Sequence, residues 1–290
     1  VFNAETTIDQ CLTAVEQQDY PKDRYEVIAV DNGSTDGTSA ILTAHPQIKI
    51  LSDSQHQSPA YARNVGIKKA RGEIFAFLDA DCKPEPDWLS CISAPFSDPS
   101  VGGVGGEILA WEPASLVERY HAYRKALSIE YIKTTSFGSF PVTANAAYRA
   151  QIFQEIGPFL ADLPASEDFE YACRMRRQTH FITQACPQAV VYHKNRSSIP
   201  ALWAQQHRNG NGTQILRRLG TMKNDPFQFT SPWLFVPIRV FQYIIYLCVN
   251  TVRVLLGRRK PFELTAICLD FIAEMGFRFG YQAAVTDVPA

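Results

Sequence analysis

The sequence predicts an α/β fold in which a doubly wound, mostly parallel sheet is followed by a helical C-terminal extension. Short apolar runs alternate with stretches of helical character in the first half of the chain, and a long amphipathic stretch lies near its end. Of the 290 residues, 46% are hydrophobic and 20% are charged, as in a globular protein with a sizeable core. The net charge of -1 gives no indication of nucleic-acid binding.

The expected strands are apolar runs short enough to cross a sheet once, and they lie at 25–30, 48–51 and 73–78. The stretches of helical character lie at 5–17, 36–44 and 59–70. Pro59 suits the first turn of a helix. Strands that are separated by helices pair in parallel and are covered on both faces, which is the reason for expecting a mostly parallel sheet.

The first residues, VFNAE, resemble the end of a strand, and we expect that strand to begin outside the sequence given. No signal peptide is visible. Seven scattered cysteines show no metal-ligand spacing, so we expect reduced thiols and a cytoplasmic setting.

Two acidic residues follow the expected strands, at the edge of the sheet where doubly wound folds bind their ligands. Asp31 follows EVIAV, and Asp79 follows EIFAFL. In the segment VDNGSTDGT, Gly33 and Gly37 permit a tight turn and Asp36 suits a helix cap. A turn explains Asp36, but it explains Asp31 less well, which makes Asp31 a candidate ligand-binding residue.

The segment FLDADC places Asp79 and Asp81 two residues apart. Residues i and i+2 of an extended segment lie on one side, so both carboxylates can reach one cation. Carboxylate oxygens suit Mg²⁺ or Mn²⁺, whereas the soft sulfur of Cys82 does not. Such a pair on its own is more often an acidic loop, so the assignment depends on the other motifs.

Two further motifs carry candidate catalytic or metal-binding side chains. Glu167 and Asp168 lie at the expected start of a helix, with Ser166 as its cap. They either complement the helix dipole or include a general base. His193 follows the run AVVY. A lone histidine is usually a packed or surface residue, and it becomes a metal ligand only if the fold brings it to Asp81.

The apolar stretch 233–256 is nearly long enough to cross a bilayer. Its polar residues fall on one narrow helical face: Arg239, Gln242, Tyr246, Asn250 and Arg253. A basic cluster at 258–260 follows, so the favoured interpretation is peripheral contact with an anionic membrane surface through 233–260. The alternatives are a core helix whose polar stripe faces solvent and a true membrane span.

Taken in order, these motifs resemble those of the family 2 glycosyltransferases, inverting enzymes with the nucleotide-sugar-binding GT-A fold. The resemblance runs from Val1 to about Gly212. It is carried by VFNAE, VDNGSTDGT, YARNVGIKKARGEIFAFLDAD, TANAAYRAQIFQEIGPF, SEDFEYACRM and AVVYH.

The resemblance implies a role for each matching residue. The donor site would comprise Phe2, Asn3, Glu5, Asp31, Asn32, Ser34, Arg63, Asn64 and Asp79. The cofactor would be Mn²⁺ or Mg²⁺, held by Asp79, Asp81 and His193 so that it stabilises the leaving diphosphate. Asp168 would be the general base with Glu167 as its substitute, and the acceptor side would include Asn145 and Arg208.

The resemblance also implies transfer from a nucleotide sugar, with UDP as the expected nucleotide, to a glycan, lipid-linked or polysaccharide acceptor of the cell envelope. Processive members carry Gln-x-x-Arg-Trp, and here Gln205 and Arg208 are followed by Asn209 in place of tryptophan. We therefore expect transfer of a single sugar. We expect HRNGNG to form either a polar loop that closes over the diphosphate or a flexible connection before the C-terminal helices. The expected location is the cytoplasm, at the inner face of the cell membrane.

The predicted domains are a transferase domain at 1–225, divided at about residue 110 into donor and acceptor halves, and a helical region at 226–290. Two other functions stay open. One is a catalytically silent nucleotide-sugar-binding module, which would need no acidic pair like that at 167–168. The other is a nucleotidyltransferase, which would carry a glycine-rich phosphate loop with basic residues near its first strand, and VFNAETT has neither.

Overall fold

The computed structural model of the chain describes residues 1–130, 140–221 and 232–284. Packing divides the chain into two compact units. The first unit comprises 1–113 and 121–195, and the second comprises 114–120 and 196–290. The sheets and the acidic motifs lie in the first unit, so that unit carries the candidate site.

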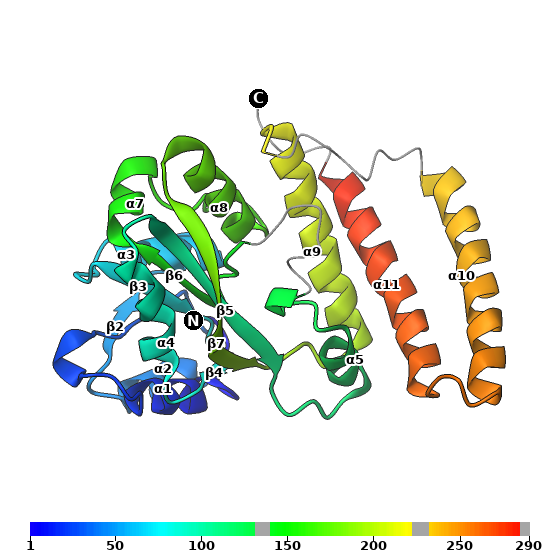
Figure 1. The fold of residues 1–290 in the computed structure, drawn as a ribbon, viewed down its shortest axis with the longest axis horizontal. Helices are drawn as coiled ribbons and strands as arrows, with labels where there is room; N and C mark the ends of the chain where they lie inside the picture. Colours follow the sequence, from blue (N-terminus) through cyan, green and yellow to red (C-terminus); the bar gives the residue numbers. More distant parts are fainter. Residues whose placement is uncertain (131–139, 222–231, 285–290) are drawn as a thin grey trace. The chain divides into compact units, whose positions relative to one another are not determined.

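The first unit contains a two-stranded sheet and a five-stranded sheet (Figure 1). In the smaller sheet, β1 (Ile28–Asp31) pairs in parallel with β2 (Lys49–Ser52). The larger sheet has the order β3-β6-β5-β7-β4. Its strands are β3 (Ile74–Leu78), β4 (Cys82–Pro84), β5 (Val101–Ala110), β6 (Asn145–Arg149) and β7 (Ile182–His193).

The prediction of a mostly parallel sheet is wrong for the larger sheet. Only β5 and β7 pair in parallel, whereas β3–β6, β5–β6 and β4–β7 are antiparallel. The prediction came from the alternation of strands and helices before residue 80, and it holds there for β1 and β2. The antiparallel partners β6 and β7 come from the second half of the chain, where the sequence shows no such alternation.

Short helices accompany these strands, and the three helical stretches expected before residue 71 are confirmed. Ser58 caps α3 by accepting a hydrogen bond from the Tyr61 amide, and Pro59 is the first helical residue. The helices of the first unit are α1 (Ile8–Glu16), α2 (Thr38–Thr43), α3 (Pro59–Ile67), α4 (Trp88–Ser93), α7 (Ala150–Ile156) and α8 (Glu167–Gln178). α5 (Leu116–Arg124) starts in the second unit, where Val117 and Tyr120 pack with Leu202, Ala266 and Leu269.

The core beside the five-stranded sheet contains a cluster of aromatic rings. Tyr148 and Tyr171 are fully buried with ring centroids 5.2 Å apart, and Phe153 stacks on Tyr171 at 4.8 Å. Phe159 and Phe77 extend this cluster to the end of β3. Rigid rings that pack in this way restrict the positions of β3 and of the start of α8, which both lead into the candidate site.

The second unit is built on three long helices, α9 (Ile199–Arg218), α10 (Pro232–Leu255) and α11 (Phe262–Ala283). α11 lies between α9 and α10 (Figure 1). α9 and α11 pack with their backbones in contact, because a Cβ atom on Gly280 would lie 1.8 Å from the His207 carbonyl oxygen. A Cβ on Gly210 would likewise lie 1.9 Å from the Phe277 carbonyl oxygen. Glycine at these positions therefore permits the close approach.

The position of α9 corrects one expectation. The segment HRNGNG is part of α9 and forms no loop, and its Gly210 lies against the backbone of α11, where helix packing needs a glycine. Compact packing also divides the chain between Asn195 and Arg196. That the transferase domain extends to residue 225 stays a prediction.

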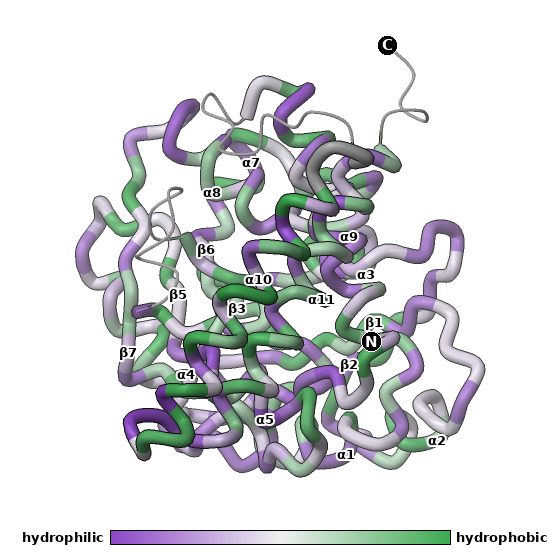
Figure 2. The backbone as a smooth tube through the Cα atoms, turned by 90° about the vertical axis from the view of Figure 1, so that its right-hand side faces the viewer, coloured by the Kyte–Doolittle hydropathy of each residue, from purple (hydrophilic) through white to green (hydrophobic). Residues whose placement is uncertain are grey.

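α10 turns much of its apolar surface outward, and most of the helix has the colour of apolar residues (Figure 2). Part of its polar face is turned inward: Arg239 forms an ion pair with Glu274 of α11, and Asn250 is fully buried. Gln242, Tyr246 and Arg253 of the polar stripe are exposed, but the apolar side is exposed as well, so a core helix is the wrong interpretation. Within the described residues, the segment Val236–Leu255 is the one helix long and apolar enough to cross a membrane. Only 6% of its most apolar stretch is buried in the protein.

Candidate active site

Asp31 ends β1 as a buried, fixed carboxylate. Its Oδ1 accepts a hydrogen bond from the Ser34 amide at 3.0 Å, and its Oδ2 accepts one from the Ser39 hydroxyl. Burial by itself raises the pKa of Asp31, but the hydrogen bonds from Ser39 and Ser34 outweigh it and hold the pKa below its usual value. Asp31 is therefore ionised at neutral pH and held in one orientation.

The segment around Asn3 is joined to the turn that follows β1. The Asn3 side-chain oxygen accepts a hydrogen bond from the Thr35 amide at 2.8 Å, and the Asn3 amide donates to the Ser34 hydroxyl at 3.0 Å. Glu5 accepts a hydrogen bond from the Gly37 amide at 2.8 Å. Asn3 has a φ of 45°, a left-handed conformation that asparagine tolerates. The structure thus brings the two predicted donor motifs together, with Phe2 half exposed beside them.

Asn32 and Asn64 use their side chains to hold the scaffold. The Asn32 amide donates to the carbonyl oxygens of Asp53 and His56 at 2.7 and 3.0 Å. Asn64 forms a pair of hydrogen bonds with the backbone of Phe159, at 2.8 and 3.0 Å. Both residues are buried, and direct contact of either with a donor stays a prediction.

Asn145 corrects an expectation, because it is fully buried and does not line an acceptor surface. Its side-chain oxygen accepts a hydrogen bond from the Trp88 indole at 2.8 Å. Its amide group donates to the carbonyl oxygens of Glu107 and Ala189 at 2.9 and 2.8 Å. These bonds satisfy the side chain inside the core, where it connects β5, β6 and β7.

Arg63 connects the donor side of the site to α8. Its guanidinium donates to Asp79 Oδ1 at 2.7 Å and to Glu167 Oε1 at 2.6 Å, and its side chain is only 13% exposed. Burial by itself raises the pKa of Asp79, but the charge and hydrogen bond of Arg63 outweigh it and hold that pKa below its usual value. The link between Arg63 and Glu167 has no signal in the sequence, because 104 residues separate the two partners.

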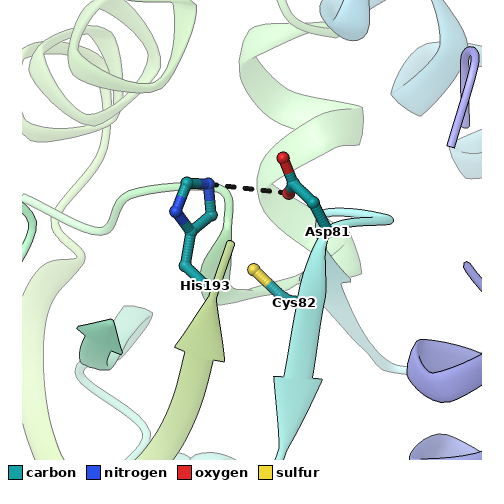
Figure 3. Close-up of side chains that lie close together, drawn as sticks. All are labelled: Asp81, Cys82 and His193. Carbon is teal, nitrogen blue, oxygen red and sulfur yellow. Dashed lines mark ion pairs between the residues drawn. The ribbon is translucent and has the colours of Figure 1, made fainter. Parts of the chain in front are cut away.

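A second cluster forms where β4 and β7 pair, because their register sets Cys82 opposite His193 (Figure 3). Ligand atoms of Asp81, Cys82 and His193 all lie within 4.8 Å of one another. His193 Nε2 lies 3.5 Å from Asp81 Oδ1, and the other ring nitrogen of His193 lies 3.2 Å from Asn195 Oδ1. A partner on the second nitrogen orients an imidazole for metal binding, as in many metal sites.

The chemistry of this cluster fits Mn²⁺. A carboxylate oxygen with one imidazole nitrogen suits Mn²⁺, whereas Mg²⁺ prefers oxygen alone. Cys82 is fully buried, and burial together with the nearby Asp79 and Asp81 raises the pKa of its thiol well above the usual value. A protonated thiol is a poor ligand, so the expectation that Cys82 is a bystander agrees with its surroundings.

Asp79 is not part of that cluster among the described residues, since its carboxylate pairs with Arg63. The structure therefore brings together two of the three predicted metal ligands, Asp81 and His193. A metal contact by Asp79 stays a prediction.

The structure gives Glu167 and Asp168 different surroundings, whereas the resemblance names Asp168 as the base and Glu167 as its substitute. Glu167 is committed to Arg63, whereas Asp168 accepts a hydrogen bond from the Phe169 amide at 2.7 Å. Burial, followed by the neighbouring charge of Glu167, raises the pKa of Asp168 to about 7. Asp168 is therefore the carboxylate suited to exchange a proton near neutral pH.

The helix that begins at Glu167 lacks the expected cap. Ser166 has a left-handed φ of 68° and its side chain makes no capping hydrogen bond. The acids of this first turn are thus placed by a strained backbone residue beside Arg63, as is common at functional sites. Arg208, the other predicted acceptor-side residue, is exposed on α9 in the second unit, and its role stays a prediction.

Comparison with known proteins gives consistent matches. The sequence model of the family described as Glycosyl transferase family 2 matches residues 1–157. The glycosyltransferase AglE of Haloferax volcanii is 35% identical over 191 residues, which cover 64% of this chain and 62% of AglE. The chain thus spans less than two thirds of the length of AglE.

Two further similarities extend along almost the whole chain. One is to a protein of Methanococcus voltae, the dolichyl N-acetyl-alpha-D-glucosaminyl phosphate 3-beta-D-2,3-diacetamido-2,3-dideoxy-beta-D-glucuronosyltransferase. The two sequences are 26% identical over 303 residues, and the match covers 97% of this chain and 93% of the relative. The solved mannosyltransferase PcManGT of Pyrobaculum calidifontis, in complex with GDP-Man and Mn²⁺, has a TM-score of 0.64 at 20% identity, and the match covers 96% of this chain and 84% of PcManGT. This likeness confirms the α/β fold of the GT-A type with helices after it.

Proposed function

The chain belongs to glycosyl transferase family 2, and on that premise we propose that it moves one sugar from a nucleotide-sugar donor to a hydroxyl group of a glycan, lipid-linked or polysaccharide acceptor, with inversion. The observation that supports this most directly is the double ion pair of Arg63. That pair links Asp79, two residues before the metal ligand Asp81, to Glu167, the neighbour of Asp168. A donor-binding side and a proton acceptor thus lie around one guanidinium.

The donor would lie along the ends of β1 and β3. Asp31 and the joined segments around Asn3 and Ser34 offer fixed polar groups to the nucleoside. Asp81 and His193 would hold Mn²⁺ or Mg²⁺, which neutralises negative charge on the diphosphate that leaves. The predicted nucleotide is UDP, whereas PcManGT was solved with GDP-Man, so the donor screen below includes both bases.

Asp168 would accept the proton of the attacking acceptor hydroxyl. A carboxylate with a pKa of about 7 takes up such a proton more readily than an ordinary aspartate does and is still largely ionised above that pH. Displacement of the diphosphate in one step, from the opposite face of the sugar, inverts the anomeric carbon. The ion pair between Glu167 and Arg63 would keep both side chains, and with them the start of α8, in place.

We further propose that the acceptor is presented at a membrane surface on the cytoplasmic side. The Methanococcus voltae relative is named for a dolichyl-linked acceptor. In this chain, α10 exposes a row of large apolar side chains, among them Phe241 at 64% and Leu255 at 81%. The basic residues 258–260 follow this row, which suits contact with anionic lipid.

A screen of nucleotide sugars tests the proposed donor class. A UDP-sugar, added with Mn²⁺, is expected to raise the melting temperature, because a ligand at 100 times its Kd adds roughly 2.7 kcal/mol to the free energy of unfolding. GDP-sugars form the parallel arm, and each donor is repeated with EDTA. No stabilisation by any nucleotide sugar would contradict the donor site. Binding without transfer to any glycan or lipid-linked acceptor would point instead to a silent module.

Vesicle flotation tests the membrane contact of α10. The triple variant Phe241→Gln, Ile245→Gln and Leu255→Gln is expected to bind vesicles containing anionic phospholipid at least about 10-fold more weakly, because each exposed apolar side chain loses its burial in lipid. The matched control replaces the exposed polar residues Gln242 and Thr251 with alanine. Equal flotation of the triple variant and the control would show that the apolar row does not contact lipid.

A further inference from the structure

The segment that leads to Asp168 is irregular until it reaches α8. Residues 157–166 consist of turns and bends. Their last residue, Ser166, has a left-handed φ of 68° and makes no side-chain capping bond. A residue keeps such a strained conformation only where its surroundings hold it in place. The position of Asp168 therefore depends on the contacts that hold this segment from outside.

The turn before α3 holds the segment at Ala161. The Ala161 carbonyl oxygen accepts two hydrogen bonds, from His56 Nε2 at 3.0 Å and from the Ser58 hydroxyl at 2.8 Å. Because a carbonyl oxygen can only accept, Nε2 of His56 carries a proton. The two donors are 105 and 103 residues away from Ala161 in the chain, so this contact is made by the fold alone.

His56 is also bonded to the donor side of the site. Its backbone carbonyl oxygen accepts a hydrogen bond at 3.0 Å from the side-chain amide of Asn32, the residue after Asp31. Its ring lies edge-on to the ring of Tyr61 with centroids 5.6 Å apart, which restricts the orientation of the imidazole. His56 thus contacts the donor turn through its backbone and the base-bearing segment through its ring.

The other contacts of the His56 ring contribute little to the stability of the fold. The side chain is 44% exposed, and the Asp162 carboxylate, 3.8 Å from Nε2, belongs to a side chain that is 99% exposed. An ion pair in such surroundings is screened by water. Ser58 is different, because its hydroxyl also caps α3. Replacement of His56 therefore removes the bond to Ala161 and leaves that cap intact.

We propose that His56 is a positioning residue, which fixes the segment leading to Asp168 at a set place relative to the donor turn at Asp31. The ring holds Ala161, and through Ala161 it restricts the turn into Ser166 and the start of α8. This inference rests on the proposed function, since the position of Asp168 matters for the rate only if Asp168 accepts a proton. A base that is displaced by a fraction of an ångström from its acceptor loses rate without loss of donor affinity.

Three variants of the whole chain test the role of the ring. His56→Leu removes the N–H donor and keeps apolar bulk beside Tyr61. His56→Gln is the conservative variant, because its side-chain amide can place an N–H group near the position of Nε2. Gln55→Leu is the matched control, since Gln55 is the exposed neighbour of His56 in the same turn.

Kinetics separate a positioning role from a donor-binding role. The assay is the release of nucleoside diphosphate from UDP-glucose and from GDP-mannose with Mn²⁺, where water takes the place of the acceptor hydroxyl. His56→Leu is expected to lower kcat by about 3- to 10-fold, as for the loss of one hydrogen bond, and to change the Kd of the donor by less than about 2-fold. His56→Gln should recover most of the rate, and Gln55→Leu should match the natural chain. An unchanged kcat in His56→Leu, or an equal loss in Gln55→Leu or His56→Gln, would overturn the proposal.

Hydrogen exchange tests the same contact without any donor. Amides in 161–168 should exchange about 5-fold faster in His56→Leu than in the natural chain, while the melting temperature stays within about 3 °C because an exposed side chain was replaced. Equal exchange in the two proteins would overturn the proposal whatever the kinetics show. If the natural chain turned over no donor while exchange in His56→Leu rose as expected, the proposed function would be contradicted and the contact between His56 and Ala161 would stand.

Discussion

Asp81→Ala is expected to lower kcat by about 1,000-fold and to abolish tight Mn²⁺ binding, because it removes the charged ligand of the proposed metal site. The diphosphate would then leave without a cation to neutralise its growing charge, which costs several kcal/mol in the transition state. The measurements are transfer kinetics with saturating donor and calorimetric titration of Mn²⁺ in the presence of UDP. His193→Ala should show the same pattern with a smaller loss of affinity.

Two controls separate metal binding from general damage to the fold. Asp23→Ala removes an exposed aspartate elsewhere in the same unit and should leave Mn²⁺ binding and transfer unchanged. Cys82→Ser tests the third member of the cluster, and it should keep the Mn²⁺ affinity of the natural chain, since the thiol is not expected to be a ligand. Unchanged Mn²⁺ affinity in Asp81→Ala would rule out this metal site.

Asp168→Asn is expected to lower kcat by about 100- to 10,000-fold while the affinity for the donor stays the same. The variant keeps the shape of the side chain and loses only the ability to accept the proton of the acceptor hydroxyl. Kinetics of transfer and calorimetry of donor binding measure the two effects. If donor affinity fell by the same factor as the rate, Asp168 would instead be a donor-binding residue.

The pH profile gives an independent check of Asp168. Because a base must be ionised, kcat/KM of the natural chain should rise with pH, with a midpoint near the Asp168 pKa of about 7. Glu167→Gln removes the neighbouring negative charge that raises this pKa, so the midpoint should move to lower pH. A midpoint that does not move would mean that another group controls the profile.

The free energy of unfolding should also depend on Asp168, but it should fall as the pH rises, whereas kcat/KM should increase. Asp168 has a pKa of about 7 in the folded protein and an ordinary value of 3.8, so the folded chain binds this proton more tightly than the unfolded chain does. Its contribution to the free energy of unfolding is therefore lost as pH rises from about 4 to about 7. At pH 8, Asp168→Asn should be more stable than the natural chain by on the order of 1–3 kcal/mol, an advantage that shrinks below pH 5. Thermal unfolding across this range measures it.

The sequence by itself was sufficient for the parts of the site that lie within one short segment. Asp31 and Asp79 were predicted at the ends of strands, because apolar runs are local signals. Asp81 was predicted on an extended segment beside Asp79, whereas the structure places Ala80 and Asp81 in a turn. The order of the motifs identified the family, and the family match confirms it. Pro59 and the three early helices were confirmed for the same local reason.

Only the tertiary structure decided which of these residues meet. The pairing of Arg63 with Glu167 and of His193 with Asp81 depends on strand order and register, which leave no periodic trace in the sequence. The burial of the other predicted residues is also known only from the structure. Asn145 lies inside the core, and burial raises the pKa of Asp168. Local sequence determines which residues lie at the end of a strand or helix. Contacts and desolvation set the chemistry of each side chain, and both depend on segments that are far apart in the chain.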